Sequence, residues 1–226
     1  MKKKQSASHL TGSLLCVLDF DGVLFNDRKF KEAHRRAFKQ YGVSLRLYED
    51  TYRETKRLTG GHYAPSTHYA LIARSVPALS RALLYKKSAA LVKQSRRYLY
   101  ADVKVFLQWC EQSGVALALV STGHFFQKKK IVASGLAPFF KKIIVTKDIA
   151  KVAGMRAVMG KIGHRRVVFV DDKQTVLDEI IKELPEVVVV RMGRSKHGVN
   201  EQNDSHVRNF AGVKKILHAI HTKSNS

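Results

Sequence analysis

The sequence has few cysteines, few acidic residues and no long apolar run. Only two cysteines, Cys16 and Cys110, occur among the 226 residues, and both lie inside apolar stretches without a CxxC or metal-ligand spacing. We therefore expect both thiols to be reduced and buried in the core, and we assign neither to catalysis. The chain is long enough to fold around a hydrophobic core without disulfides.

No apolar stretch approaches the roughly 20 residues that a membrane-spanning helix needs. The start of the chain, MKKK, has the positive charge of a secretory signal, but the apolar stretch that follows is short and runs into Asp19. We therefore expect a cytoplasmic protein with no membrane partner.

Acidic residues are scarce relative to basic ones: 18 Asp and Glu accompany 41 Lys and Arg, for a formal net charge of +23. Such an excess fits either a solvated basic surface or a face that binds a polyanion such as nucleic acid. The charge is dispersed rather than gathered in one stripe, which favours the solvated surface and leaves nucleic-acid binding as the weaker alternative. The basic clusters are Lys2–Lys4, Arg96–Arg97, Lys128–Lys130, Lys141–Lys142 and Arg165–Arg166.

Apolar residues make up 45% of the chain, and short apolar runs alternate with amphipathic stretches of helical length. Uninterrupted apolar strands are typical of a parallel sheet covered on both faces. The pattern predicts an α/β fold with a Rossmann-like doubly wound parallel sheet, whose site lies at the carboxyl ends of the strands. The predicted strands are Leu14–Phe20, Val115–Val120, Ile143–Val145, Val167–Val170 and Val187–Val190, and the predicted helices are Asp102–Gln112, Phe125–Ala133, Ile149–Lys161, Thr175–Leu184 and Asn209–His221.

One stretch interrupts this alternation. From Asn26 to about Tyr100 the sequence is polar and helical, and it has no comparable buried strand. We interpret residues 26–100 as an inserted α-helical cap, and residues 1–25 and 101–226 as the core domain. Residues 59–66, TGGHYAPS, form the one obvious loop of this cap.

Two aspartates end the first predicted strand. Asp19 and Asp21 lie two residues apart, and the turn that begins at Gly22 lets both carboxylates approach one point in space. Two negative charges at such a short distance need a cation or a shared proton between them. Phosphoryl transfer suits both solutions, because one carboxylate attacks phosphorus, the other handles the proton of the leaving group, and a magnesium ion neutralises the oxygens.

Two further polar clusters follow later strands. Asp171 and Asp172 come directly after an apolar strand, where adjacent acids are costly unless they meet a cation. Ser121, Thr122 and Gly123 follow another strand just ahead of a helix, where hydroxyls and free backbone N–H groups can hold phosphate oxygens. Helix capping explains either cluster taken alone. The combination of clusters in strand-end order is what predicts a phosphate site.

The order of these motifs resembles the haloacid dehalogenase superfamily of phosphatases and phosphomutases. The segment LDFDGVLF at residues 18–25 resembles the first motif of that superfamily, Ser121 falls on the second, and VFVDD at residues 168–172 falls on the fourth. The positions that fit the first cap helix of its helical-cap members are Ala33, Phe38 and Gly42. The resemblance covers about Leu14 to Arg191 and implies the same core with a helical cap.

The resemblance also implies roles for the acidic residues. Asp19 would form the aspartyl-phosphate, and its carboxylate would bind Mg²⁺ together with the backbone carbonyl of Asp21. Asp172 aligns with the usual metal ligand of the family, and Asp171 would lie beside it. Family members that cleave carbon–halogen bonds or phosphonates do not keep an aspartate at the position of Asp21, so a phosphate ester or a phosphate shift is implied.

The sequence departs from the family pattern in two places. The third motif, a lysine that offsets charge between nucleophile and phosphate, lacks its usual Lys-Pro pair, and both Lys147 and Lys151 lie in the expected span. Lys151 is the preferred candidate and Lys147 the alternative. The fourth motif lacks a second acid four residues after Asp172, where Val176 stands, so weaker metal binding or a water in that position is expected.

These observations favour a magnesium-dependent phosphomonoester hydrolase that acts on a small phosphorylated metabolite beneath the cap. A phosphomutase would use the same residues. The alternative from another class is a basic nucleic-acid-binding protein, or a nucleic-acid-end phosphatase, on the same scaffold. His62, with Arg57 before it, and His124 could contact substrate, although each also fits an ordinary polar surface position.

Overall fold

The computed structural model describes residues 14–162, 166–194 and 206–222. Two parts of the basic clusters, Lys2–Lys4 and Arg165, lie outside these residues. Within them, six strands form one sheet in the order β3-β2-β1-β4-β5-β6, and every neighbouring pair is parallel. The strands are β1 (Leu14–Leu18), β2 (Ala116–Thr122), β3 (Lys142–Thr146), β4 (Arg166–Asp171), β5 (Val187–Met192) and β6 (His206–Val207).

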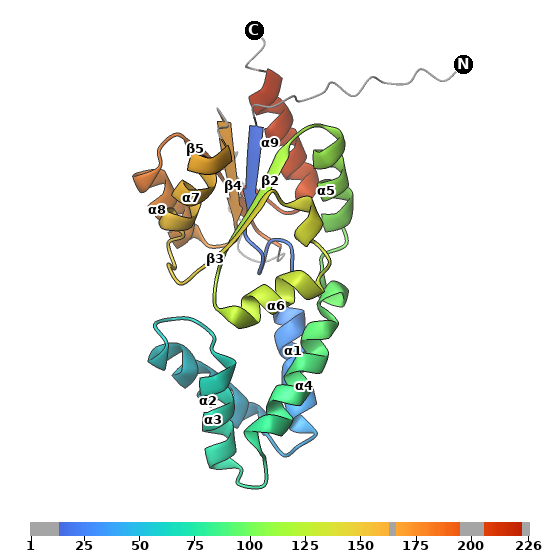
Figure 1. Cartoon of the computed structure of the whole chain (residues 1–226), viewed down its shortest axis with the longest axis vertical. Helices are drawn as coiled ribbons and strands as arrows, with labels where there is room; N and C mark the ends of the chain where they lie inside the picture. The colour runs from blue at the N-terminus through green and yellow to red at the C-terminus, as the bar shows by residue number, and fades with distance from the viewer. Residues whose placement is uncertain (1–13, 163–165, 195–205, 223–226) are drawn as a thin grey trace, which may run out of the picture.

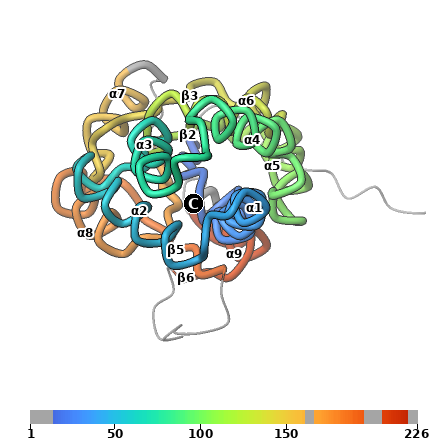
Figure 2. Tube along the Cα trace, turned by 90° about the horizontal axis from the view of Figure 1, so that it is seen from below, coloured from blue at the N-terminus to red at the C-terminus, as the bar shows by residue number. Residues whose placement is uncertain are grey.

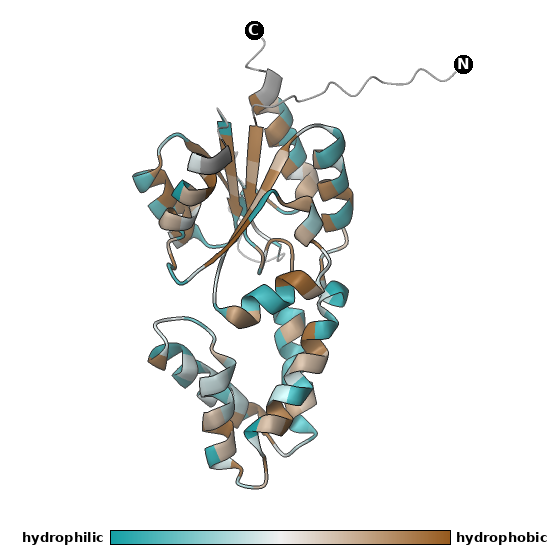
Figure 3. Ribbon diagram, in the orientation of Figure 1, coloured by the Kyte–Doolittle hydropathy of each residue, from teal (hydrophilic) through white to brown (hydrophobic). Residues whose placement is uncertain are grey.

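Helices cover both faces of this sheet (Figure 1). Alternate residues of β1 enter opposite layers: Leu14, Cys16 and Leu18 pack with α5 and α9, whereas Leu15 and Val17 pack with α7 and α8. The strands are accordingly the most apolar part of the molecule (Figure 3). The core helices are α5 (Val103–Gln112), α6 (Phe125–Ala133), α7 (Val152–Ile162), α8 (Gln174–Glu183) and α9 (Phe210–Thr222).

Four helices between β1 and α5 form a second, smaller body beyond the carboxyl edge of the sheet (Figure 1), and the view from below in Figure 2 looks onto this body. They are α1 (Asp27–Lys39), α2 (Leu45–Leu58), α3 (Pro65–Ser75) and α4 (Arg81–Lys93), followed by the 3₁₀ turn η1 (Ser95–Tyr98). Side chains of Asn26, Ser44 and Ser80 cap α1, α2 and α4 by accepting a backbone N–H of the first turn. This body has its own apolar cluster, which includes Phe38, Tyr48, Tyr69, Ile72 and Leu84.

A polar network crosses the centre of that body. His34 on α1 shares hydrogen bonds with the hydroxyls of Tyr48, Tyr69 and Ser88, which lie on the three other helices. The imidazole is almost fully buried, and burial lowers the pKa of His34 to about 3. His34 is therefore neutral at physiological pH and joins the four helices into one rigid unit.

The chain enters and leaves this body at one place. The backbone N–H of Asn26 donates to the Tyr98 carbonyl at 2.7 Å, and that of Tyr100 donates to the Leu24 carbonyl at 3.1 Å. The outgoing and returning segments therefore run side by side between the sheet and the helices.

The observed fold confirms the predicted doubly wound parallel sheet with an inserted helical cap. The two cysteines are free and buried, as predicted. Strand β6 was not predicted, because its two residues make no apolar run. Among the residues described here, no helix combines the length and apolarity needed to cross a membrane.

Candidate functional site

Asp19 follows the last residue of β1 at the carboxyl edge of the sheet. Its backbone N–H donates to the Val170 carbonyl of β4 at 3.0 Å, which continues the pairing of the two strands past the end of β1. The side chain is 2% exposed. A carboxylate this deeply buried requires a cation beside it.

Lys151 supplies that cation. Its Nζ lies 2.9 Å from Asp19 Oδ1 and 2.6 Å from Asp171 Oδ2, and the lysine is fully buried. Burial by itself lowers the pKa of the Lys151 ammonium, but the Asp19 and Asp171 carboxylates together outweigh burial and raise it. Lys151 is therefore charged and bridges the ends of β1 and β4.

The backbone at Lys151 explains how its side chain reaches the site. Lys151 has φ +63°, the one left-handed backbone among the described non-glycine residues. This conformation turns the chain immediately before α7, whose first turn begins with the Met155 N–H donating to the Lys151 carbonyl. Strain of this kind often marks a functional position.

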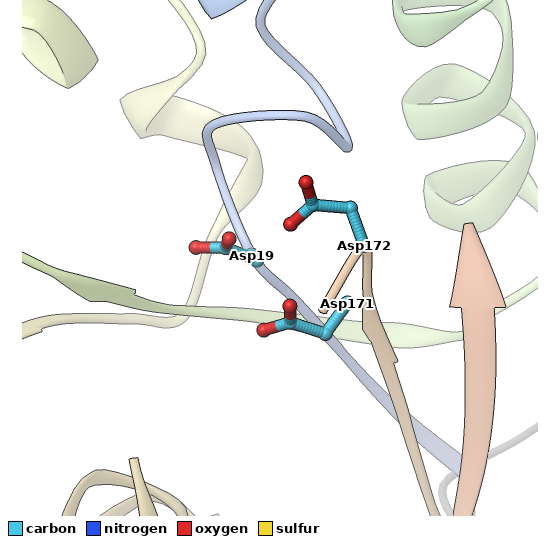
Figure 4. Close-up of side chains that lie close together, drawn as sticks. All are labelled: Asp19, Asp171 and Asp172. Atoms are coloured by element: carbon cyan, nitrogen blue, oxygen red, sulfur yellow. The ribbon is translucent and has the colours of Figure 1, made fainter. Parts of the chain in front are cut away.

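Asp19, Asp171 and Asp172 place one carboxylate oxygen each within 4.8 Å of one another where β1 and β4 end (Figure 4). Asp171 is engaged by Lys151 and by the Lys173 N–H, whereas Asp172 Oδ1 is buried and accepts no hydrogen bond from the described residues. Burial, together with the Asp19 and Asp171 charges, raises the pKa of Asp172 to about 7. Clustered oxygen ligands with one free, buried carboxylate oxygen are a donor set that fits Mg²⁺.

Gly22 keeps the first loop close to this cluster. It has φ +79°, and a Cβ built at this residue would lie 2.4 Å from Asp172 Oδ2. Both the conformation and the close approach require glycine. The loop that carries Asp21 can therefore fold down onto the acidic group at the end of β4.

Asp21 points to other partners in the same cavity. Its two carboxylate oxygens lie 2.7 Å and 2.9 Å from Lys130 Nζ, and Gln127 Nε2 donates to Oδ2 at 2.9 Å. Lys130 is 5% exposed and lies against the rings of Phe20, Phe25 and Phe30, with its Nζ 4.8 to 5.7 Å from their centroids. The interpretation of Lys128–Lys130 as surface charge is therefore wrong for Lys130.

The hydroxyl residues at the end of β2 are only partly available to a ligand. Ser121 is buried and its Oγ accepts from Gln127 Nε2 at 3.1 Å, while Thr122 and Gly123 line the cavity. The Gly123 N–H donates to the Thr146 carbonyl at 2.8 Å, so this amide is already paired rather than free. Gln127 links the segment to Asp21.

The remaining candidates lie further out. Lys147 is exposed and lines a neighbouring groove, whereas Lys151 forms the ion pairs with Asp19 and Asp171. His62 and His124 contact each other edge to face at 5.4 Å and line the cavity, whereas Arg57 is exposed and pairs with Glu54. Val176 is buried in the core, so no acid of α8 takes the missing position of the fourth motif.

The cavity between the sheet edge and the cap has a volume of about 250 Å³. The core contributes Asp21, Asp172, Lys130 and Gln127, and the cap contributes Asp27 together with aromatic and basic side chains. Sequence reasoning missed Gln127 and Lys130. Their three-residue spacing on a helix that directly follows Ser121-Thr122-Gly123 is the signal that could have found them.

A family model described as haloacid dehalogenase-like hydrolase matches residues 16–178. The chain therefore belongs to the haloacid dehalogenase-like hydrolases. No curated protein matches the sequence significantly.

Solved structures of the same fold cover nearly the whole chain. The HAD-hydrolase YfnB from Bacillus subtilis, determined with bound magnesium, is 18% identical, with a TM-score of 0.65 and coverage of 91% of this chain and 98% of its own. A HAD phosphatase from Thermococcus onnurineus is 16% identical (TM-score 0.67, coverage 90% and 97%), and the L-2-haloacid dehalogenase from Xanthobacter autotrophicus is also 16% identical (TM-score 0.64, coverage 91% and 98%). At these identities the likeness shows the fold alone.

Proposed function

We propose that the protein is a magnesium-dependent phosphomonoester hydrolase that acts on a small phosphorylated metabolite. One observation carries the proposal: Asp21, which lines the same cavity as Asp172, is present two residues after Asp19. A dehalogenase has no leaving-group oxygen to protonate and so has no use for a second carboxylate at this position. Phosphate ester cleavage requires one.

The residues of the site take the following parts in this reaction. Asp19 attacks phosphorus while the bond between phosphorus and the ester oxygen breaks, and Asp21 gives its proton to the departing oxygen. Water then hydrolyses the aspartyl-phosphate on Asp19, and Asp21 accepts the proton of that water. Lys151 holds Asp19 in place and offsets negative charge where the phosphate meets the carboxylate.

Asp19, Asp172 and the backbone carbonyl of Asp21 would hold the magnesium ion. The metal, when bound, neutralises phosphate oxygens and orients them for attack. Asp171 supports this set indirectly, because its carboxylate is already paired with Lys151.

Removal of magnesium tests the proposal. We expect the purified protein to hydrolyse 4-nitrophenyl phosphate, EDTA to abolish the activity, and added Mg²⁺ to restore it, because the buried carboxylates otherwise repel the phosphate. The measurement is phosphate release, with chloride release from 2-chloropropionate assayed in parallel. Chloride release without phosphate release would show a dehalogenase instead.

Two substitutions distinguish the roles of the adjacent acids Asp171 and Asp172 in metal binding. Asp172→Ala is expected to raise the Mg²⁺ concentration for half-maximal activity by at least about tenfold, because it removes a ligand. Asp171→Asn is expected to leave this concentration nearly unchanged and to lower the midpoint of thermal unfolding, because Lys151 loses one of its two counter-charges. Magnesium titrations and melting curves of both variants check this, and the reverse order would assign the ligand to Asp171.

Phosphate chemistry also admits a polymeric substrate. The cap stands over the acidic cluster and leaves a cavity of about 250 Å³, which favours a small ester over a polymer end. Rates of phosphate release from monomeric phosphates and from 5′- and 3′-phosphorylated oligonucleotides, measured at two salt concentrations, distinguish a small ester from a polymer end as the substrate.

A further inference from the structure

A second hollow lies beside the catalytic cavity. It is a groove of about 1020 Å³ walled by α3, α4 and α6, and it shares His62, His124 and Phe126 with the cavity. The two hollows therefore adjoin at these three side chains.

The groove is mostly apolar. Its walls include Tyr85, Ala89 and Val92 of α4 and Phe125 and Val132 of α6. Phe125 and Val132 are large apolar side chains, yet they are 70% and 69% exposed. Exposed apolar side chains gathered in one groove indicate a binding surface.

The charge around the groove favours a ligand whose net charge is negative. Its lining includes four lysines, Lys93, Lys128, Lys129 and Lys147, and no Asp or Glu among the residues that the structure describes. Two copies of this chain facing each other here would bring eight lysines together, on molecules that each carry a formal charge of +23. This disfavours a second copy and favours an anion with an apolar body.

The sizes of the two hollows fit the same conclusion. The cavity of about 250 Å³ is smaller than the roughly 300–1,000 Å³ of ordinary ligand pockets. It has room for a phosphate and the first atoms of the alcohol, whereas the groove has room for a much larger apolar group.

We propose that the groove binds the alcohol portion of the substrate, and that the substrate is a phosphomonoester of a large apolar alcohol. This inference rests on the proposed phosphatase function and names its substrate class. The phosphate would lie at Asp19, the ester oxygen at Asp21, and the apolar chain would pass His62 and His124 into the groove. The lysine stems would cover the chain while their ammonium groups stay in water.

A series of n-alkyl phosphates from ethyl to octyl tests the inference. Burial of a methylene group strengthens binding by up to about fourfold, so kcat/KM is expected to rise at least about tenfold from ethyl to octyl phosphate. The assay is phosphate release below the micelle concentration of each ester. Equal kcat/KM along the series would overturn the inference and leave the phosphatase function standing.

Two variants locate the effect. Val132→Asp should abolish the dependence on chain length and leave ethyl phosphate turnover unchanged, because it places a charge in the groove. Val105→Asp is the matched control, since Val105 is 65% exposed on α5 and does not line the groove, and it should behave like the wild type. Ala89→Trp, which fills the groove from the exposed face of α4, should also reduce the gain from longer chains.

Binding separates this inference from the phosphatase function. Calorimetry of octyl and ethyl phosphate with the Asp19→Asn protein should show tighter binding of the octyl ester, and Val132→Asp should remove the difference. If no ester is hydrolysed but this difference is found, the function fails and the groove stands as a site for apolar anions. If octyl phosphate binds no better than ethyl phosphate, or if light scattering shows a dimer that Val132→Asp dissociates, the groove does not bind the alcohol.

Discussion

Replacing Asp19 with asparagine is expected to lower kcat for aryl phosphates by at least about a thousandfold, the size of effect seen when an enzyme loses its nucleophile. The amide has nearly the same shape as the carboxylate, but it cannot attack phosphorus. Lys151 keeps Asp171 as a partner at 2.6 Å, so the fold should be retained. The measurements are steady-state phosphate release and the circular dichroism spectrum of the variant.

The Asp178→Asn variant is a suitable control. Asp178 is an exposed aspartate of α8 that accepts a hydrogen bond from Gln174 and does not line the cavity. It should retain wild-type kcat. A folded Asp19→Asn protein with more than a small fraction of the wild-type rate, or phosphate found on Ser121 by mass spectrometry, would remove Asp19 from the role of nucleophile.

The position of Asp19 follows almost directly from the sequence. The run LLCVL is apolar at every position, so it is stable only where both faces are covered, and a parallel sheet provides this environment. The next residue must then lie at the carboxyl edge of the sheet. The same reasoning places Asp171 and Asp172 at the end of β4 and Ser121 near the end of β2, and the structure has these residues around one site.

The choice between Lys147 and Lys151 could not be made in the same way. The sequence pattern places Lys151 in a helix from Ile149, but α7 begins at Val152, so both lysines lie in the irregular segment between β3 and α7. Lys151 has a left-handed backbone and its Nζ reaches Asp19, and the presence of a lysine in a sequence does not predict such a conformation. The structure brings Lys151 to Asp19 and places Lys147 in the wall of the neighbouring groove.

The partners of Asp21 were missed for a different reason. Three consecutive lysines at 128–130 look like solvated charge, and Lys128 and Lys129 are indeed exposed. Helix α6, however, packs its inner face on the first loop, so Lys130 is buried among three phenylalanine rings with Asp21 as its ion-pair partner. Burial of one residue in a charged run depends on tertiary packing, which composition does not encode.

The buried ion pair between Lys130 and Asp21 gives the second prediction of a large loss of rate. Lys130→Met should lower kcat about ten- to a hundredfold with little change in KM, because Asp21 loses the ammonium group that holds both of its oxygens, and a misplaced catalytic group costs about this much. Methionine matches the length of the lysine stem and suits the surrounding rings, so the fold should persist. Lys130 acts through Asp21 and is thus a positioning residue.

The leaving group distinguishes this role from a structural one. If Lys130 positions Asp21 for proton donation, Lys130→Met should slow phenyl phosphate far more than 4-nitrophenyl phosphate, because nitrophenolate departs with little help from an acid. Lys130→Arg should recover part of the loss, since a guanidinium can still donate to both oxygens. Lys104 is an exposed lysine of α5, so the Lys104→Met variant provides the control and should change neither rate. An equal loss for both esters, or a fall in the melting temperature that matches the loss of rate, would show that Lys130 supports only the packing of α6 on the first loop.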